Sequence, residues 1–247
     1  RLSLPKAHTQ NLVYNSKMAA KVDSSLVQDG YQLYHHAFFF SKNGAWAVVQ
    51  QGMNQDNRTA RRYHWYADSP MMENFVNEPH TAISSQLLQP TVLNLVSRES
   101  NNTREISTEL AQSSFETVMK DIEILRRHFS RYSRMISMKR DDEQLTLLEL
   151  EPTEFHTHPV ELEDFTKRRY LEKILQKVTY YKPEDYESFL AMEGVGPKTV
   201  RALSLVSEVI YGATPSYEDP ARYSFAHGGK DATPYPVDRS TYDKVIG

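Results

Sequence analysis

Two glycines between two helical runs form the stretch whose residue types and spacing predict a chemistry most specifically. Proline at the first position of a helix, with glycine in the turn before it, is a strong boundary signal, so two helices joined by a tight turn are expected. The N–H groups that open the second helix would face outward, where they and nearby basic side chains suit a DNA phosphate. This pattern is typical of the helix-hairpin-helix motif. The predicted DNA-binding residues are Gly194, Val195, Gly196, Pro197, Lys198, Thr199 and Arg201.

The same turn leaves two other interpretations open. In the first, it is an ordinary corner between helices in which Val195 only packs. In the second, it resembles the motif of DNA glycosylases with lyase activity, in which a lysine two residues after the second glycine is a Schiff-base nucleophile. Lys198 has that position, and Asp219 would be its partner after the Gly212 and Pro215 loop.

A second group of polar residues, in the first third of the chain, could hydrolyse a phosphodiester. The reaction requires a base or nucleophile, a proton donor for the leaving oxygen and a cation for the phosphate, and histidine, carboxylate and arginine supply all three. The same side chains could hold a divalent metal, manganese, magnesium or zinc, although their spacing matches no specific metal motif. The predicted catalytic residues are Asp29, His36, Gln51, Arg62, His64, Glu78 and His80.

A third interpretation is a DNA-binding or scaffold protein without catalysis. Aromatic side chains would stack on unpaired bases while arginines hold the phosphates. The aromatic candidates are Tyr31, Tyr34, Tyr63 and Trp65, and the arginines are Arg61 and Arg62.

Composition limits the partners and the chemistry. The chain has 247 residues, 39% of them hydrophobic, and a net charge of −3, so any contact with DNA must be local rather than the effect of a basic field. Cysteine is absent, which excludes disulfides, thiol catalysis and cysteine zinc sites. No apolar stretch approaches the ~20 residues of a membrane span. A soluble, cytoplasmic protein is therefore expected, and its oligomeric state is left open.

Local patterns predict the elements that must position these residues. A helix is expected over 12–27, a β-hairpin over 31–40 and 45–51 with an Asn-Gly turn, and short strands and loops over 52–80. Further helices are expected over 91–98, from Arg104 or Ser114 to Ser137, and over 162–181, 183–194 and 197–211. A strand is expected over 144–150, and Asp238 would cap a last helical turn.

The fold class that follows is α+β, with a mixed N-terminal region containing the β-hairpin and a helical module after it. A proline-bracketed stretch at 151–159 is the expected boundary. Residues 1–151 would form the mixed α/β catalytic region, and residues 160–247 the helix-hairpin-helix module with its Gly/Pro-rich tail. The predicted function is a DNA repair or processing nuclease that grips the DNA backbone without sequence preference.

Five longer sequence segments resemble those of an uncharacterised archaeal and bacterial family known as domain of unknown function 763. They lie at residues 27–36, 46–54, 61–65, 78–81 and 223–231, so the resemblance covers most of the chain. It implies DNA binding through the same helical turn and an additional segment upstream of Arg1. It implies little about activity.

Overall fold

The α+β class is confirmed by the structure, a computed structural model that describes residues 6–85, 87–129 and 168–221. The chain divides into two compact units. The described residues up to 101 and those over 215–221 form the first, which we call the sheet unit. The described residues between 102 and 214 form the second, the helical unit.

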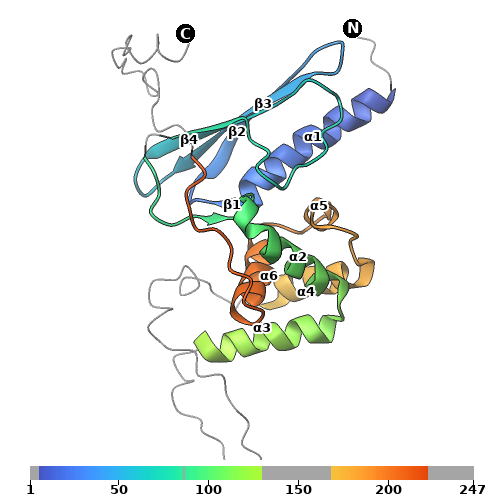
Figure 1. The fold of residues 1–247 in the computed structure, drawn as a ribbon, viewed down its shortest axis with the longest axis vertical. Helices are drawn as coiled ribbons and strands as arrows, with labels where there is room; N and C mark the ends of the chain where they lie inside the picture. The colour runs from blue at the N-terminus through green and yellow to red at the C-terminus, as the bar shows by residue number, and fades with distance from the viewer. Residues whose placement is uncertain (1–5, 86, 130–167, 222–247) are drawn as a thin grey trace, which may run out of the picture. The chain divides into compact units, whose positions relative to one another are not determined.

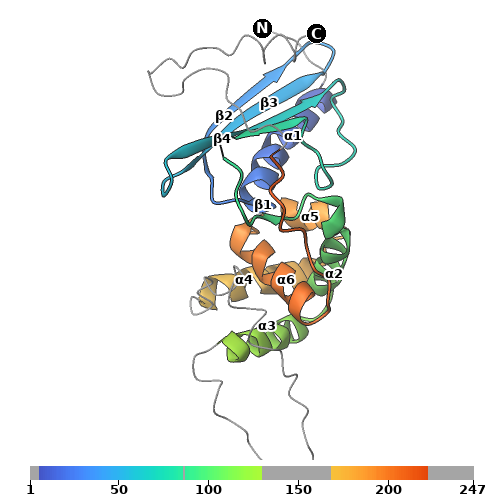
Figure 2. The ribbon, with the colours of Figure 1, turned by 60° about the vertical axis from the view of Figure 1, so that its left-hand side comes forward.

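The sheet unit is built around a four-stranded antiparallel sheet with one long helix against it. The helix is α1 (Lys6–Ser25), and it lies along one face of the sheet in both views (Figure 1, Figure 2). The strands follow the chain in the order β2-β3-β4-β5, each paired with the next. They are β2 (Gln32–Phe40), β3 (Trp46–Asn54), β4 (Thr59–Ala67) and β5 (Ala82–Ser85).

The predicted hairpin is confirmed, because β2 and β3 pair on either side of a turn in which Gly44 has a φ of +91°. The expectation of short strands and loops over 52–80 is wrong for its first half, where β4 runs for 9 residues. Bulky residues on both sides of β4 hid its alternation in the sequence. In the structure Tyr63 and Trp65 face α1 and are buried, while their neighbours face the other way.

A second, two-stranded sheet corrects the helix predicted over 91–98. Here β6 (Leu93–Asn94) pairs with β1 (Val27–Gln28), and the Asn94 N–H donates to the carbonyl of Ser216. These pairings with distant segments outweigh a local helical preference. A short 3₁₀ turn, η1 (Arg98–Ser100), follows, with Ser97 as its N-cap.

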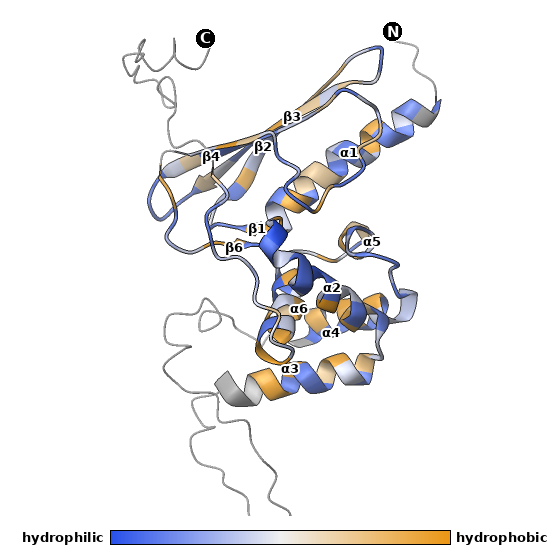
Figure 3. Cartoon of the chain, in the orientation of Figure 1, coloured by the Kyte–Doolittle hydropathy of each residue, from blue (hydrophilic) through white to orange (hydrophobic). Residues whose placement is uncertain are grey.

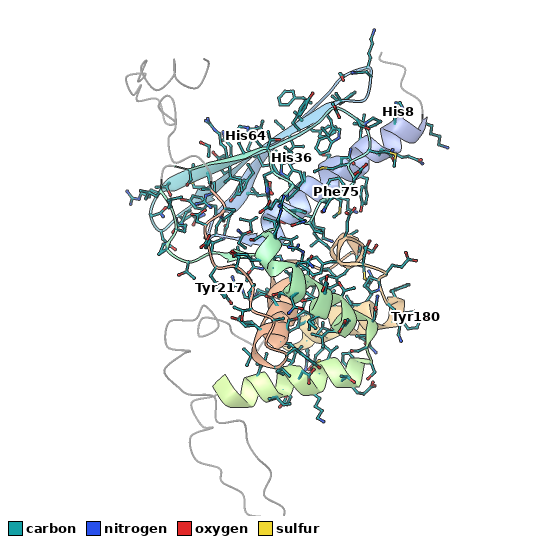
Figure 4. The ribbon with its side chains drawn as sticks, in the orientation of Figure 1. His8, His36, His64, Phe75, Tyr180 and Tyr217 are labelled. Carbon is teal, nitrogen blue, oxygen red and sulfur yellow. The ribbon has the colours of Figure 1, made fainter. Side chains whose placement is uncertain are left out.

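The core of the sheet unit lies between α1 and the sheet. Met18, Val22 and Leu26 of α1 are buried there. Phe75 comes from the loop after β4, and its ring lies 6.4 Å from that of Trp46 and 6.1 Å from that of Trp65, centroid to centroid (Figure 4). The loop is therefore anchored on the same side of the sheet as α1.

Among its described residues the helical unit has five helices, and the mixed colours of Figure 3 show that each carries hydrophobic and hydrophilic residues. They are α2 (Asn101–Gln112), α3 (Phe115–Phe129), α4 (Arg168–Tyr181), α5 (Tyr186–Ala191) and α6 (Pro197–Val209). Mutual packing of α3, α4 and α6 buries Ile122, Leu175 and Val206. None of the helices among the described residues combines the length and apolar character that crossing a bilayer requires.

Of the two starts expected for the long helix, the structure has the one at Ser114, because α3 begins at Phe115 and α2 is a separate helix before it. The two helices are separated at Ser113 and Ser114, where the Ser114 hydroxyl accepts a hydrogen bond from the Thr117 N–H and caps α3. The expected boundary at 151–159, the strand over 144–150 and the turn at Asp238 lie outside the described residues, so they stay predictions. The compact units nevertheless place α2 and α3 with α4 to α6.

A buried arginine ties together three distant segments of the sheet unit. Arg61 on β4 pairs with Asp29 through a 2.8 Å Nη1–Oδ2 contact and with Asp219 through a 2.6 Å Nη2–Oδ2 contact. The three side chains are between 0 and 6% exposed. The Tyr63 hydroxyl also donates to Asp29, at 2.7 Å. Removing the arginine would leave two carboxylates buried without their cation.

This ion cluster predicts a difference in stability between neighbouring arginines. Arg61→Met should lower the free energy of unfolding by about 3–5 kcal/mol. Arg62→Met, a matched control on the opposite face of β4, should change it by no more than about 0.5 kcal/mol. Urea unfolding followed by circular dichroism measures both, and equal effects of the two substitutions would contradict the structural role of Arg61.

Candidate functional site

The seven residues predicted to be catalytic do not converge on one site. Strand alternation directs neighbouring side chains to opposite faces of the sheet, so residues close in sequence are separated. His36 lies on the face of the sheet that packs on α1, and Asp29, which precedes β2, accepts a hydrogen bond from Arg61 on that face. Gln51, Arg62 and His64 project from the opposite face, and Glu78 and His80 line a cavity.

Asp29 and His36 have structural partners. Burial raises the pKa of the Asp29 carboxyl, against the opposing effect of the Arg61 guanidinium. Burial and the nearby Asp29 charge raise the pKa of Tyr63 well above its usual value, so its hydroxyl stays a donor. His36 lies between the sheet and α1 (Figure 4), where Nδ1 meets Gln50 Oε1 at 3.0 Å and Nε2 meets the Ser16 hydroxyl at 2.9 Å.

One functional candidate was missed by the sequence prediction, Asp23 on the buried face of α1. Its carboxylate accepts hydrogen bonds from Gln50 Nε2 and from Trp65 Nε1, the latter at 3.0 Å, and it pairs with His80 Nε2. A lone aspartate at helical spacing from Ala19 and Leu26 was the signal that could have revealed it. A carboxylate beneath a histidine fixes which ring nitrogen carries the proton.

A cavity of about 440 Å³ opens beside His80. Glu78 and Arg98 lie on its wall and form an ion pair of 3.0 Å. Asn94 also lines it, and no described group donates a hydrogen bond to the buried Asn94 Oδ1 atom. The volume of the cavity is in the range of small-ligand sites. Among the residues that the structure describes, no three histidine, aspartate or glutamate side chains are grouped as a metal site would need.

The second face of the sheet carries the remaining candidates, and we call it the outer face. It is defined by three rows of neighbours in the strand register: Phe39, Ala47 and Tyr66; Ala37, Val49, His64 and Ala82; and His35, Gln51, Arg62 and Ser84. His64 marks this face in Figure 4. Burial, and then the Arg62 charge, lower the pKa of His64, which favours the uncharged imidazole. No described helix of the sheet unit covers this face.

The predicted turn between two helices is present as α5, a turn at 192–196, and α6. Gly194 has a φ of +91°, a conformation that favours glycine. Helix α4 binds the carbonyls of the turn: Tyr170 donates to the Gly194 carbonyl at 3.2 Å, and Lys177 to the Glu193 carbonyl at 3.1 Å. No described group accepts a hydrogen bond from the N–H of Gly196 or Lys198.

The predicted DNA-binding residues in this turn divide by exposure. Val195 is 3% exposed and Thr199 is 1% exposed, so these two side chains shape the turn from inside. Lys198 and Pro197 are exposed, and Gly196 and Arg201 are partly exposed. Only part of the predicted set can therefore reach a ligand.

The aspartate expected to assist Lys198 in a lyase is already engaged. Both oxygens of Asp219 accept hydrogen bonds from Arg61, and the N–H groups of Gln89 and Ala221 donate to it at 2.6 and 2.8 Å. This arrangement gives Asp219 a structural role in the sheet unit. The lyase interpretation stays untested, and the contacts of Asp219 do not support it.

Together these features define an α+β protein with an open-faced antiparallel sheet and a helical unit whose turn presents backbone donors. The chain belongs to the family described as "Protein of unknown function (DUF763)", which it matches over residues 1–237. The predicted family resemblance is thereby confirmed. No curated protein and no solved structure matches the chain.

The two glycines of the turn should respond differently to alanine. A Cβ atom on Gly194 would collide with Ile174 Cδ1, and alanine would have to adopt the φ of +91°, which is strained for any residue with a side chain. Gly194→Ala should therefore lower the free energy of unfolding by about 1–3 kcal/mol. A Cβ atom on Gly196 meets nothing within 4 Å, so Gly196→Ala should leave stability unchanged or raise it by up to about 1 kcal/mol. Thermal unfolding distinguishes them, and an equal loss for both would contradict this description of the turn.

Proposed function

We propose that this protein binds the DNA phosphate backbone, without sequence preference, through the turn that opens α6. The observation that carries the proposal is the asymmetry of that turn. Its carbonyl groups at 193 and 194 are bound by α4, whereas the N–H groups of Gly196 and Lys198 have no described acceptor. The free N–H groups favour an anion, and the exposed carboxylate of Glu193 in the same turn is paired with Lys177 Nζ at 3.4 Å.

Charge and helix geometry support the same ligand. Helix α6 has 13 residues, and its N-terminal end, with a partial positive charge, begins at Pro197. Lys198 is exposed in the first turn, where its ammonium group can add to the attraction of the free N–H groups. Contacts of this kind position a protein on DNA and carry no sequence information. We propose a cytoplasmic role in DNA repair or processing.

A bulky side chain at the turn tests this proposal. Gly196→Val should place its methyl groups over the free N–H groups and weaken binding to duplex DNA about ten-fold or more, since the extended φ of −149° at this position accepts valine. Lys198→Ala should reduce the slope of log affinity against log salt by about 0.9. Fluorescence anisotropy with a labelled duplex over a salt series measures both effects.

The matched control is Lys182→Ala, which removes a lysine from the end of α4 and leaves the turn unchanged. It should leave both affinity and salt slope at the wild-type values. Circular dichroism confirms that the variants are folded. Wild-type affinity in Gly196→Val and Lys198→Ala would contradict the proposal.

A second candidate function, phosphodiester hydrolysis, is favoured by the Asp23–His80 pair at the cavity. Because the Nε2 atom of His80 pairs with the Asp23 carboxylate, Nε2 carries a proton. The Nδ1 atom of His80 is then the ring nitrogen that can accept a proton from an attacking water. Glu78 and Arg98 add a carboxylate and a cation on the same cavity wall. The side chains of this cavity could assist a divalent metal only together with ligands from elsewhere, because they do not group in threes.

Cleavage assays test this second candidate. His80→Ala should slow cutting of labelled duplex, single-stranded or abasic DNA by about 10²-fold or more in the presence of magnesium or manganese. His8→Ala, a histidine exchange at the start of α1, is the control and should leave the rate unchanged. Undiminished cutting by His80→Ala, or no cutting of any substrate, would contradict hydrolysis at this cavity.

A further inference from the structure

The outer face of the sheet combines three properties that suit a ligand-binding surface. Its large aromatic side chains are turned to solvent: Tyr34 is 55% exposed, Phe39 is 59% and Tyr66 is 60%. Strands β2 to β5 contain no aspartate or glutamate. Arg62, in the centre of the polar row, forms no ion pair with any described residue, and its Nε atom is buried without a partner.

We propose that the outer face binds single-stranded DNA, with bases stacked on Phe39 and Tyr66 and a phosphate held by Arg62. The proposal rests on the proposed DNA-binding function and names a class of substrate for it. Three of the four aromatic residues that the sequence predicted to stack on bases, Tyr31, Tyr63 and Trp65, are buried in the core and cannot do so.

The strand register gives the surface dimensions that suit unpaired bases. Phe39 and Tyr66 flank Ala47 in one row, so their backbones are separated by two strand spacings, about 10 Å. The next row, about 7 Å further along the strands, holds Ala37, Val49 and His64. Small side chains thus lie between the aromatic ones, which leaves room for a flat base against each ring.

The polar row supplies the contacts that a sugar-phosphate backbone needs. Gln51 lies between His35 and Arg62 in the register, and its Oε1 atom accepts a 2.6 Å hydrogen bond from the hydroxyl of Tyr34. Tyr34 occupies the irregularity in β2 between Leu33 and His35, which sets it beside this row. The Arg62 guanidinium is the one permanent charge of the outer face, and it is positive.

Charge favours a polyanion over a protein or a second copy of this chain. Carboxylates occur in the neighbouring sequence only outside the strands, at Asp29, Asp56, Asp68, Glu73 and Glu78. The strands that form the face therefore present no negative charge that would repel a phosphate backbone. Stacking on exposed rings selects unpaired bases, because the bases of a duplex are already stacked on each other.

The test uses fluorescence anisotropy of the full chain with a labelled oligothymidylate of about 12 nucleotides, within the usual site size. Tyr66→Leu and Phe39→Leu should each weaken binding about five-fold or more, whereas Tyr66→Phe, which keeps the ring, should bind like the wild type. Arg62→Gln should reduce the salt slope by about 0.7. Tyr180→Leu, an aromatic exchange at a residue 79% exposed on α4 (Figure 4), is the matched control.

The same variants with duplex DNA separate this inference from the proposed function. Unchanged single-strand affinity in Tyr66→Leu and Phe39→Leu, with loss of duplex binding in Gly196→Val, would overturn the inference alone. Loss of single-strand binding in the sheet variants, with no effect of Gly196→Val on either DNA, would support the inference and contradict the proposed grip of α6. Tighter binding of the matching oligouridylate than of the DNA would overturn the assignment of single-stranded DNA.

Discussion

The buried guanidinium of Arg61 is the interaction on which the sheet unit depends. It joins β4 to Asp29, which follows β1, and to Asp219, near the end of the described chain. Because two buried carboxylates share one cation, none of the three groups can leave without exposing the others to an apolar interior. The ion cluster therefore fixes which face of β4 turns inward. Arg62, the next residue, is thereby directed to the outer face.

Local signals allowed a large part of the fold to be predicted. Pro197 predicts the start of α6, Gly194 predicts the turn before it, and the Asn-Gly pair at Gly44 predicts the hairpin. Each signal is local, because it depends on the backbone conformation that the residue itself prefers. The helix expected over 91–98 was wrong because Asn94 is paired with residues far along the chain. Pairing of that kind leaves no trace in a short window of sequence.

The candidate site was predicted less well than the fold, for a physical reason. Residue types that suggest catalysis are also those that satisfy one another in a buried network, and sequence does not distinguish the two uses. His36 is exposed, yet both of its ring nitrogens are bonded within the sheet unit, to Gln50 and Ser16, whereas His80 reaches the wall of the cavity. His80 is distinguished from His36 by its pairing with Asp23 of α1, and this pairing joins residues that are far apart in the sequence.

Hydrogen exchange of the backbone tests the proposed grip on DNA most directly. The N–H groups of Gly196 and Lys198 have no described acceptor, so they should exchange quickly in the free protein. Exchange of the full chain should be measured by mass spectrometry with and without saturating duplex DNA. The proposal predicts slowed exchange in peptides that cover the opening of α6. Bound DNA that leaves exchange there unchanged would contradict it.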